Sequence, residues 1–94
     1  MRKIEKIAVI GGDARQAALS SLLADEGYET ATWAVKGDVG NAVRCVTWQN
    51  AVNSASAVIL PIVAEDEMGR LNAPFALDGA QIPVLNDILE ASDA

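Results

Sequence analysis

The fold is decided by residues 6–16, KIAVIGGDARQ, in which a short apolar run meets two glycines, an acid and a base. The run over residues 6–10 is almost continuously apolar and β-branched, as is typical of a strand that is covered on both faces. Gly11 and Gly12 end the run and allow the chain to turn at positive φ. A strand that leads into such a turn is a common beginning of a parallel α/β fold.

A helix is predicted over residues 15–26, directly after this turn. Its apolar positions fall on one helical face, formed by Ala18, Leu19, Leu22 and Leu23. Gly27 follows at the place where a left-handed residue commonly ends a helix. We therefore expect a helix that packs its apolar face on the sheet.

The next part of the chain supplies two more strands and a short helix. Strands are predicted over residues 28–35 and 57–61, where Pro61 ends the second one. Between them lie a brief extended piece at 42–46 and one or two helical turns at 48–53. This alternation predicts parallel strands joined by crossovers.

The last third of the chain is less regular. Residues 62–70 form a predicted loop, and residues 71–78 form either a small hairpin or an irregular segment. A closing helix has Pro83 in its first turn, and its apolar face is formed by Val84, Leu85, Ile88 and Leu89. The whole pattern predicts the α/β class, as a small parallel-sheet, three-layer domain of flavodoxin-like or Rossmann-like layout.

Length and composition indicate a single globular domain over residues 1–94. Hydrophobic residues make up 51% of the chain and charged residues 21%, unlike the balance of disordered chains. Thirteen acidic and seven basic residues give a net charge of -6, which disfavours nucleic acid and anionic membranes as partners. The sequence shows neither a signal-peptide core nor the roughly 20 apolar residues of a membrane span. We expect a cytoplasmic protein.

Metal and redox sites are not expected. Cys45 is the only cysteine and the chain has no histidine, which leaves no internal disulfide and no zinc ligand set. Cys45 is predicted to be a small buried apolar residue. Trp33 and Trp48 either stack on a planar ligand or fill the core, and the core is favoured. The acids at 65–67 either include a general base or form a solvated loop, which is favoured because no base accompanies them.

The glycine turn does not match a dinucleotide fingerprint, which needs glycine at three places. Counting from Gly11 puts Asp13 and Gln16 at the second and third places, and counting from Gly12 puts two alanines there. A carboxylate about 4 Å from a phosphate costs roughly 4 kcal/mol at the effective dielectric of a protein surface. The spacing instead predicts a capping box, in which Asp13 accepts from the Gln16 amide and the Gln16 side chain reaches back.

Two cations near this turn have alternative roles. Arg15 either holds a substrate carboxylate in bidentate fashion or forms a surface ion pair with a local acid. Asp13 is expected to orient Arg15 or to cap the helix, but not both. Lys36 either meets a 2′-phosphate or is simply solvated. A nucleotide-binding module is the weakest of the functions that we consider.

The stretch KIAVIGGDARQ at 6–16, together with AVILPI at 57–62, resembles the N-terminal domain of the dipicolinate synthase A subunit. The hexapeptide GGDARQ at 11–16 is the most specific part of this resemblance. It implies a two-domain, NAD(P)-dependent oxidoreductase that acts with a B subunit during sporulation. Such enzymes convert a dihydrodipicolinate-type precursor to dipicolinate, a small dicarboxylate.

The resemblance also implies a substrate site in this domain. Its residues would line an interdomain cleft, with Pro61 on one wall and, on the other, Gly11, Gly12, Asp13, Arg15 and Gln16. The family's Rossmann domain, which carries the glycine-rich motif for NAD or NADP, is missing from this sequence. No cofactor is therefore expected in this chain, and its 94 residues are not expected to be catalytic alone.

The end of the sequence leaves a second function open. The predicted closing helix reaches Ala94 with no strand after it, so we expect a fragment of a longer two-domain protein. The alternative is a non-catalytic module that dimerises or docks a partner subunit through an unpaired sheet edge. A homo-oligomer is possible in either case.

Overall fold

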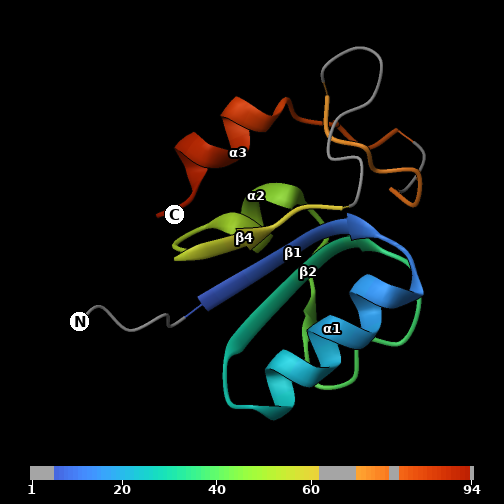
Figure 1. Ribbon diagram of the computed structural model, residues 1–94. Helices are drawn as coiled ribbons and strands as arrows, with labels where there is room; N and C mark the ends of the chain where they lie inside the picture. Colours follow the sequence, from blue (N-terminus) through green and yellow to red (C-terminus); the bar gives the residue numbers. More distant parts are fainter. Residues whose placement is uncertain (1–5, 62–69, 77–78, 94) are drawn as a thin grey trace.

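The computed structural model describes residues 6–61, 70–76 and 79–93 (Figure 1). Its sheet has four parallel strands in the order β3-β2-β1-β4. Their bounds are β1 Lys6–Gly12, β2 Glu29–Val35, β3 Val43–Arg44 and β4 Ala57–Ile59. The chain builds outward from β1 to β2 and β3, then crosses to place β4 on the other side of β1. The order therefore reverses between β1 and β4, which is the switch point where open α/β sheets bind ligands.

The topology confirms the predicted fold class. The three longer strands lie in the order 2-1-4, which matches the first half of a flavodoxin-like sheet. With the two-residue β3 added at the edge, the order matches the first half of a Rossmann sheet. The prediction of three strands and a brief extended piece is confirmed, and β1 is longer than predicted because it runs through both glycines.

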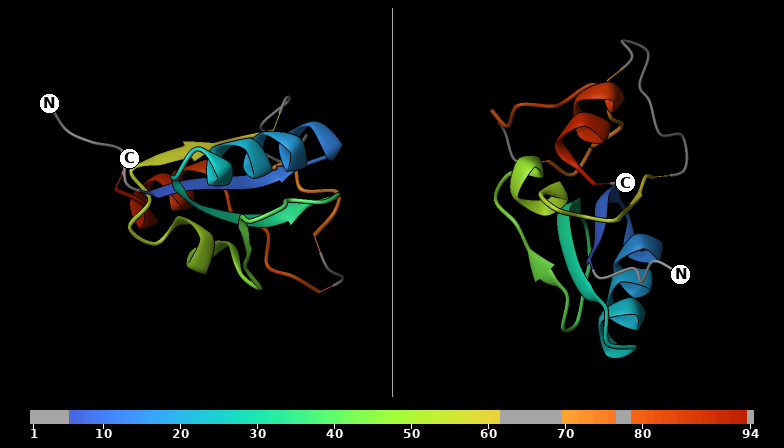
Figure 2. Two further views of the ribbon diagram at one scale, coloured as in Figure 1. Left: turned by 90° about the horizontal axis from the view of Figure 1, so that it is seen from below. Right: turned by 90° about the vertical axis from the view of Figure 1, so that its left-hand side faces the viewer.

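Helices cover both faces of the sheet, which makes three layers (Figure 2). Helix α1 (Ala14–Asp25) lies on one face, and the shorter α2 (Trp48–Val52) and α3 (Leu85–Ala91) lie on the other. The side chains of β1 alternate between these two faces of the sheet. Ile7 and Val9 pack in the cluster beneath α1, and Ala8 and Ile10 pack in the larger cluster beneath α2 and α3.

Helix α1 packs on the sheet mainly through small residues, so the apolar face that the sequence predicts is only partly confirmed: Leu23 packs against the cluster beneath α1 and Leu19 is half-buried. The buried positions are Ala17 and Ser20, whereas Ala18 is exposed and Leu22 is 57% exposed. Ala17 belongs to the same cluster as the β1 side chains, and Ser20 Oγ donates to the Gln16 carbonyl at 2.8 Å. Small residues allow the helix to lie close to the strands, and this close approach outweighs the larger apolar side chains.

The end of α1 confirms the role predicted for Gly27. Its φ of +99° is left-handed. The Gly27 N–H donates to Ala24 O at 3.1 Å and the Tyr28 N–H donates to Leu23 O at 3.2 Å. These two bonds form a Schellman motif, which satisfies carbonyls that the helix leaves unpaired.

The two central strands, β1 and β2, have irregular backbone conformations at positions that lie side by side in the sheet. Gly11 in β1 and Ala34 in β2 both have positive φ, at +79° and +57°. Trp33 packs in the cluster beneath α2 and α3, and Val35 packs beneath α1, although only one residue separates them. Ala34 therefore reverses the side-chain alternation just before the carboxyl edge of the sheet.

The C-terminal part differs from the prediction in two ways. Pro83 precedes the N-cap residue Val84 and does not lie in the first helical turn. Ile88 is the buried residue of α3, whereas Leu89 is 58% exposed, so the helix presents a narrower apolar face than predicted. A helix of seven residues has only about two turns, so few of its side chains can pack against α2 and the sheet.

Residues 70–76 form an irregular segment. Of the two alternatives predicted for residues 71–78, a small hairpin or an irregular segment, the described residues fit the second. Arg70 forms an isolated antiparallel bridge with Val84, and the Leu71 N–H donates to Pro83 O at 2.8 Å. Leu71 anchors the segment in the core, where it is 1% exposed. The acids at 65–67, and all of the loop predicted at 62–70 except Arg70, lie outside the described residues.

Both tryptophans occupy the core, as predicted. Trp33 is 5% exposed and its Nε1 donates to Val46 O at 3.2 Å. Trp48 is 7% exposed, and its buried Nε1 has no hydrogen-bond partner among the described residues. Of the helices that the structure describes, none has the length and apolarity needed to cross a bilayer.

Candidate functional site

A pocket of about 140 Å³ opens at the carboxyl ends of β1 and β4, and we call it the switch-point pocket. It is lined by Gly12, Asp13, Arg15, Gln16, Pro61, Asn72, Pro74 and Phe75. Five of the six residues predicted for the substrate site thus surround one space. The sixth, Gly11, is buried beside it, where an added Cβ would lie 3.1 Å from Asn72 O and 3.3 Å from Pro61 Cγ.

Asp13 both caps α1 and pairs with Arg15, so the expectation that it would do only one of these is wrong. Its Oδ1 accepts from the Arg15 backbone N–H at 3.0 Å. The Arg15 guanidinium contacts the same carboxylate through Nε and Nη2, each at 3.4 Å. One carboxylate serves both purposes because the N–H and the guanidinium belong to the same residue of the first turn. These bonds from Arg15 lower the pKa of Asp13.

Gln16 does not complete a capping box. The cap bond comes from the Arg15 N–H in place of the predicted Gln16 N–H. The Gln16 side chain turns to the end of β4, where its Nε2 donates to Leu60 O at 3.2 Å. An unpaired strand-end carbonyl competes successfully for this amide because helix α1 starts beside it. Gln16 thereby links the start of α1 to the end of β4 across the switch point.

The absence of a side chain at Gly12 makes this arrangement possible. An added Cβ would lie 2.2 Å from Gln16 Cγ and 2.8 Å from Gln16 Cβ. The φ of +119° at Gly12 is also one that other residues rarely adopt. The second glycine of the turn therefore makes room for a protein side chain, a role that requires no phosphate ligand.

The segment over residues 72–76 brings residues that the sequence did not assign to the site. Asn72, Pro74 and Phe75 form the wall opposite α1. Their approach depends on an irregular segment anchored by Leu71, and no periodicity in the sequence signals it. Lys36 is exposed, as the solvated alternative predicts, and its ammonium also lies 5.2 Å from the Phe75 ring centroid.

The family model for the N-terminal domain of the dipicolinate synthase A subunit matches residues 6–92. The chain belongs to this family. The match covers every strand and helix of the fold and confirms the resemblance inferred from the sequence. Searches among curated proteins and among solved structures returned no match.

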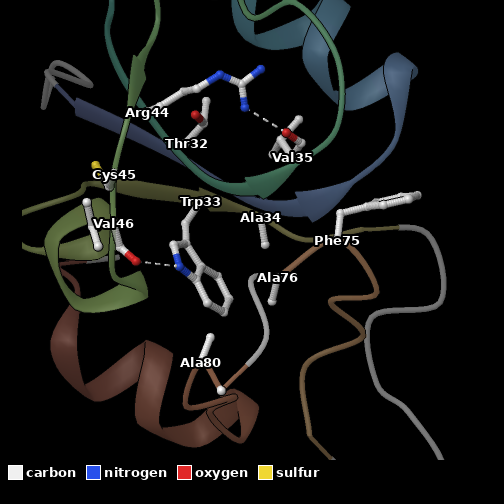
Figure 3. Close-up of a pocket in the computed structure, with 11 residues that line it drawn as sticks. Thr32, Trp33, Ala34, Val35, Arg44, Cys45, Val46, Phe75, Ala76 and Ala80 are labelled. Atoms are coloured by element: carbon white, nitrogen blue, oxygen red, sulfur yellow. Dashed lines mark hydrogen bonds between the residues drawn. The ribbon is translucent and has the colours of Figure 1, made fainter.

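This family member also has a larger pocket beside β2 and β3, of about 440 Å³, which we call the Trp33 pocket (Figure 3). Its walls are mainly apolar, and in Figure 3 the side chains of Trp33, Ala76 and Ala80 lie around the space. Phe75 lines both pockets, so the two are neighbours along the carboxyl edge of the sheet. The sequence did not predict this pocket, because its walls come from segments far apart in the chain.

The main polar side chain that lines the Trp33 pocket, Arg44, already makes hydrogen bonds within the protein. The Arg44 guanidinium donates to Val35 O at 2.8 Å and to Gly37 O. Cys45 is half-buried, so it is less enclosed than predicted, and burial raises the pKa of its thiol. Within the described residues, no group of three or more His, Cys, Asp or Glu side chains is placed to hold a metal ion.

Proposed function

We propose that this domain binds the dicarboxylate substrate of an NAD(P)-dependent oxidoreductase, with Arg15 as the cation that receives a carboxylate. The observation that carries the proposal is the meeting of α1, the end of β4 and residues 72–75 around one pocket at the switch point. Open α/β sheets bind their ligands at this location. Gly12, Asp13, Gln16 and Pro61 would shape the same site, with Gly11 behind it.

Arg15 has the geometry to bind an anion. Its side chain is 75% exposed, and Asp13 contacts only the Nε and Nη2 groups. Among the described residues, Nη1 has no hydrogen-bond partner and remains available to donate. A guanidinium oriented by a neighbouring carboxylate loses less freedom on binding.

The same turn is poorly suited to the diphosphate of a dinucleotide. Asp13 places a negative charge at the start of α1 and already accepts the Arg15 N–H. We therefore propose that NAD or NADP is bound by a domain outside this sequence, as the family resemblance implies. The cofactor would accept a hydride while a dihydrodipicolinate-type ring loses that hydride and a proton and becomes aromatic. The residues described here would bind and orient the ring.

The wider biological role follows from the family as a proposal. We propose a cytoplasmic enzyme of sporulation that acts with the dipicolinate synthase B subunit. These partners are consistent with the net charge of -6, which gives no support to nucleic acid or anionic membranes as ligands.

The test is steady-state kinetics of the full-length protein with its B subunit. Arg15→Gln should lower kcat/KM for the dicarboxylate about 10- to 100-fold, since a hydrogen bond to a charged group contributes about 1.5–3 kcal/mol. The KM for NAD(P) should stay within about twofold. Lys6→Gln is the matched control, because it removes the same charge at the opposite end of β1, where Lys6 Nζ donates to Asn53 O. An unchanged kcat/KM in Arg15→Gln would refute the proposal.

One observation favours the docking alternative. Val43 in β3 and Val46, two residues after the end of β3, are 58% and 80% exposed, and β3 pairs with no other described strand than β2. A second copy pairing there would bury both side chains. Sedimentation equilibrium of the wild-type protein and of Val46→Glu tests this: a dimer that the substitution dissociates supports edge pairing, and a wild-type monomer excludes it.

A further inference from the structure

The switch-point pocket carries no excess positive charge from the residues that line it. Its two charged lining residues are Asp13 and Arg15, whose side chains pair at 3.4 Å. A ligand with one carboxylate can be matched by Arg15, but a dicarboxylate brings a second negative charge. Leaving that charge without a cation would weaken binding. A further cation at the rim would therefore strengthen the binding of a dicarboxylate.

Lys36 is placed to supply this cation. Its backbone N–H donates to Gly12 O at 3.0 Å, which fixes the start of its side chain beside the glycine turn. Its ammonium reaches over Phe75, at 5.2 Å from the ring centroid. Phe75 is itself a lining residue of the switch-point pocket. The charge of Lys36 thus lies against the wall of the site, although Lys36 is not a lining residue.

Phe75 lines both the switch-point pocket and the Trp33 pocket. In Figure 3 the ring points away from the side chains of Trp33 and Ala76, which lie around the larger pocket. Phe75 is 40% exposed, so part of the ring is open to a ligand. An exposed aromatic face beside a cation is suited to a planar ring that carries a negative group.

Another cation near β2 is less suitable. The Arg44 guanidinium is bonded to the carbonyls of Val35 and Gly37, and these bonds hold it at the end of β2. Lys36 makes no such bond through its ammonium in the described residues, and its contact with Phe75 is one that a carboxylate can share.

We infer that Lys36 and Phe75 form the second half of the dicarboxylate site and select a planar ring with two carboxylates over one with a single carboxylate. Phe75 would lie against the flat ring, Arg15 would bind one carboxylate and Lys36 the other. This inference rests on the proposed function, and it adds the residues that set the specificity for a diacid.

The test compares two probes, pyridine-2,6-dicarboxylate and pyridine-2-carboxylate, by calorimetry with the full-length protein in metal-free buffer. Lys36→Gln should weaken diacid binding about five- to tenfold and change monoacid binding by less than about twofold. Lys36→Arg should restore the preference, because arginine also pairs with an aromatic face. Lys6→Gln, with the same change of charge at the far end of the sheet, should bind both acids as the wild type does.

Phe75→Leu provides a second measurement that keeps the wall apolar. It should weaken both acids by a similar factor of about three to ten, because each loses the aromatic surface beneath its ring. An unchanged affinity for both acids would contradict the role of Phe75.

The outcomes separate this inference from the proposed function. If Arg15→Gln weakens both acids while Lys36→Gln affects neither, or affects both equally, the role of Lys36 is refuted and the proposed function stands. If the wild-type protein binds neither acid, or Arg15→Gln changes neither affinity, the proposed function fails and this inference fails with it.

Discussion

Substitution of Gly12 by alanine tests the central contact of the switch point. The new Cβ would lie 2.2 Å from Gln16 Cγ, far inside van der Waals contact, so the Gln16 side chain would have to leave. Its hydrogen bond to Leu60 O at 3.2 Å would then be lost. That bond contributes about 1 kcal/mol, and a non-glycine residue at such a φ costs about 1–3 kcal/mol. Gly12→Ala should therefore destabilise the fold by about 2–4 kcal/mol.

Gly27→Ala is the matched control. Gly27 also has a positive φ, at +99°, but no atom lies within 4 Å of its added Cβ. This substitution introduces backbone strain without a steric clash, and it should cost about 1–2 kcal/mol. In a domain of this size 1 kcal/mol changes the Tm by about 4–8 °C. The Tm should fall by more than about 10 °C in Gly12→Ala and by roughly half as much in Gly27→Ala.

Thermal unfolding of the single and double variants measures the contact itself. In the Gln16→Ala background the Cγ atom is absent, so Gly12→Ala should cost about 1 kcal/mol less than in the wild type. Equal effects of Gly12→Ala and Gly27→Ala, or strict additivity with Gln16→Ala, would show that the Gly12 to Gln16 contact has no energetic role.

Two further predictions concern the tryptophans and the cap. In chemical unfolding, Trp33→Phe should be more destabilising than Trp48→Phe by about 1 kcal/mol. The reason is that, within the described residues, only the Trp33 indole donates a hydrogen bond, to Val46 O. Equal losses of unfolding free energy in the two variants would contradict this. The pKa of Asp13 is lowered, so its carboxylate stabilises the fold above the ordinary aspartate pKa of about 3.9, and this contribution is lost as the pH falls through the lower folded-state value. The Tm difference between wild type and Asp13→Asn should be present at about pH 6 and should shrink as the pH falls below the ordinary aspartate pKa; a constant difference would show that the charge of Asp13 is irrelevant.

The regular part of the fold follows from local sequence. The β-branched runs of β1, β2 and β4 are long enough to predict buried strands, and Gly27 predicts the end of α1 through its conformation alone. The buried face of α1 could not be predicted from hydrophobicity. Ala17 and Ser20 are buried because small side chains permit close packing, and such a preference depends on the sheet beneath the helix.

From the sequence, only the side of the site formed by the glycine turn and the start of α1 could be predicted. Asp13, Arg15 and Gln16 adjoin the glycine turn, so the sequence places them at the switch point, but it predicted a capping box and did not indicate that the Gln16 side chain donates to Leu60 O. Phe75 and Lys36 are 39 positions apart in the chain, and only the tertiary structure brings the ring and the ammonium together. Contacts between distant irregular segments leave no periodic signal.

The left-handed residue at Ala34 has a consequence for comparing members of the family. Because it reverses the alternation, Trp33 and Val35 anchor opposite helical layers from positions that are only two apart. In a regular strand, residues one or three positions apart point to opposite faces, so a relative with one residue fewer or one more here would keep both anchors without a left-handed residue. Relatives of the same length should therefore have, at this middle position, a residue that tolerates positive φ, and alignments of divergent relatives should accept a one-residue gap there.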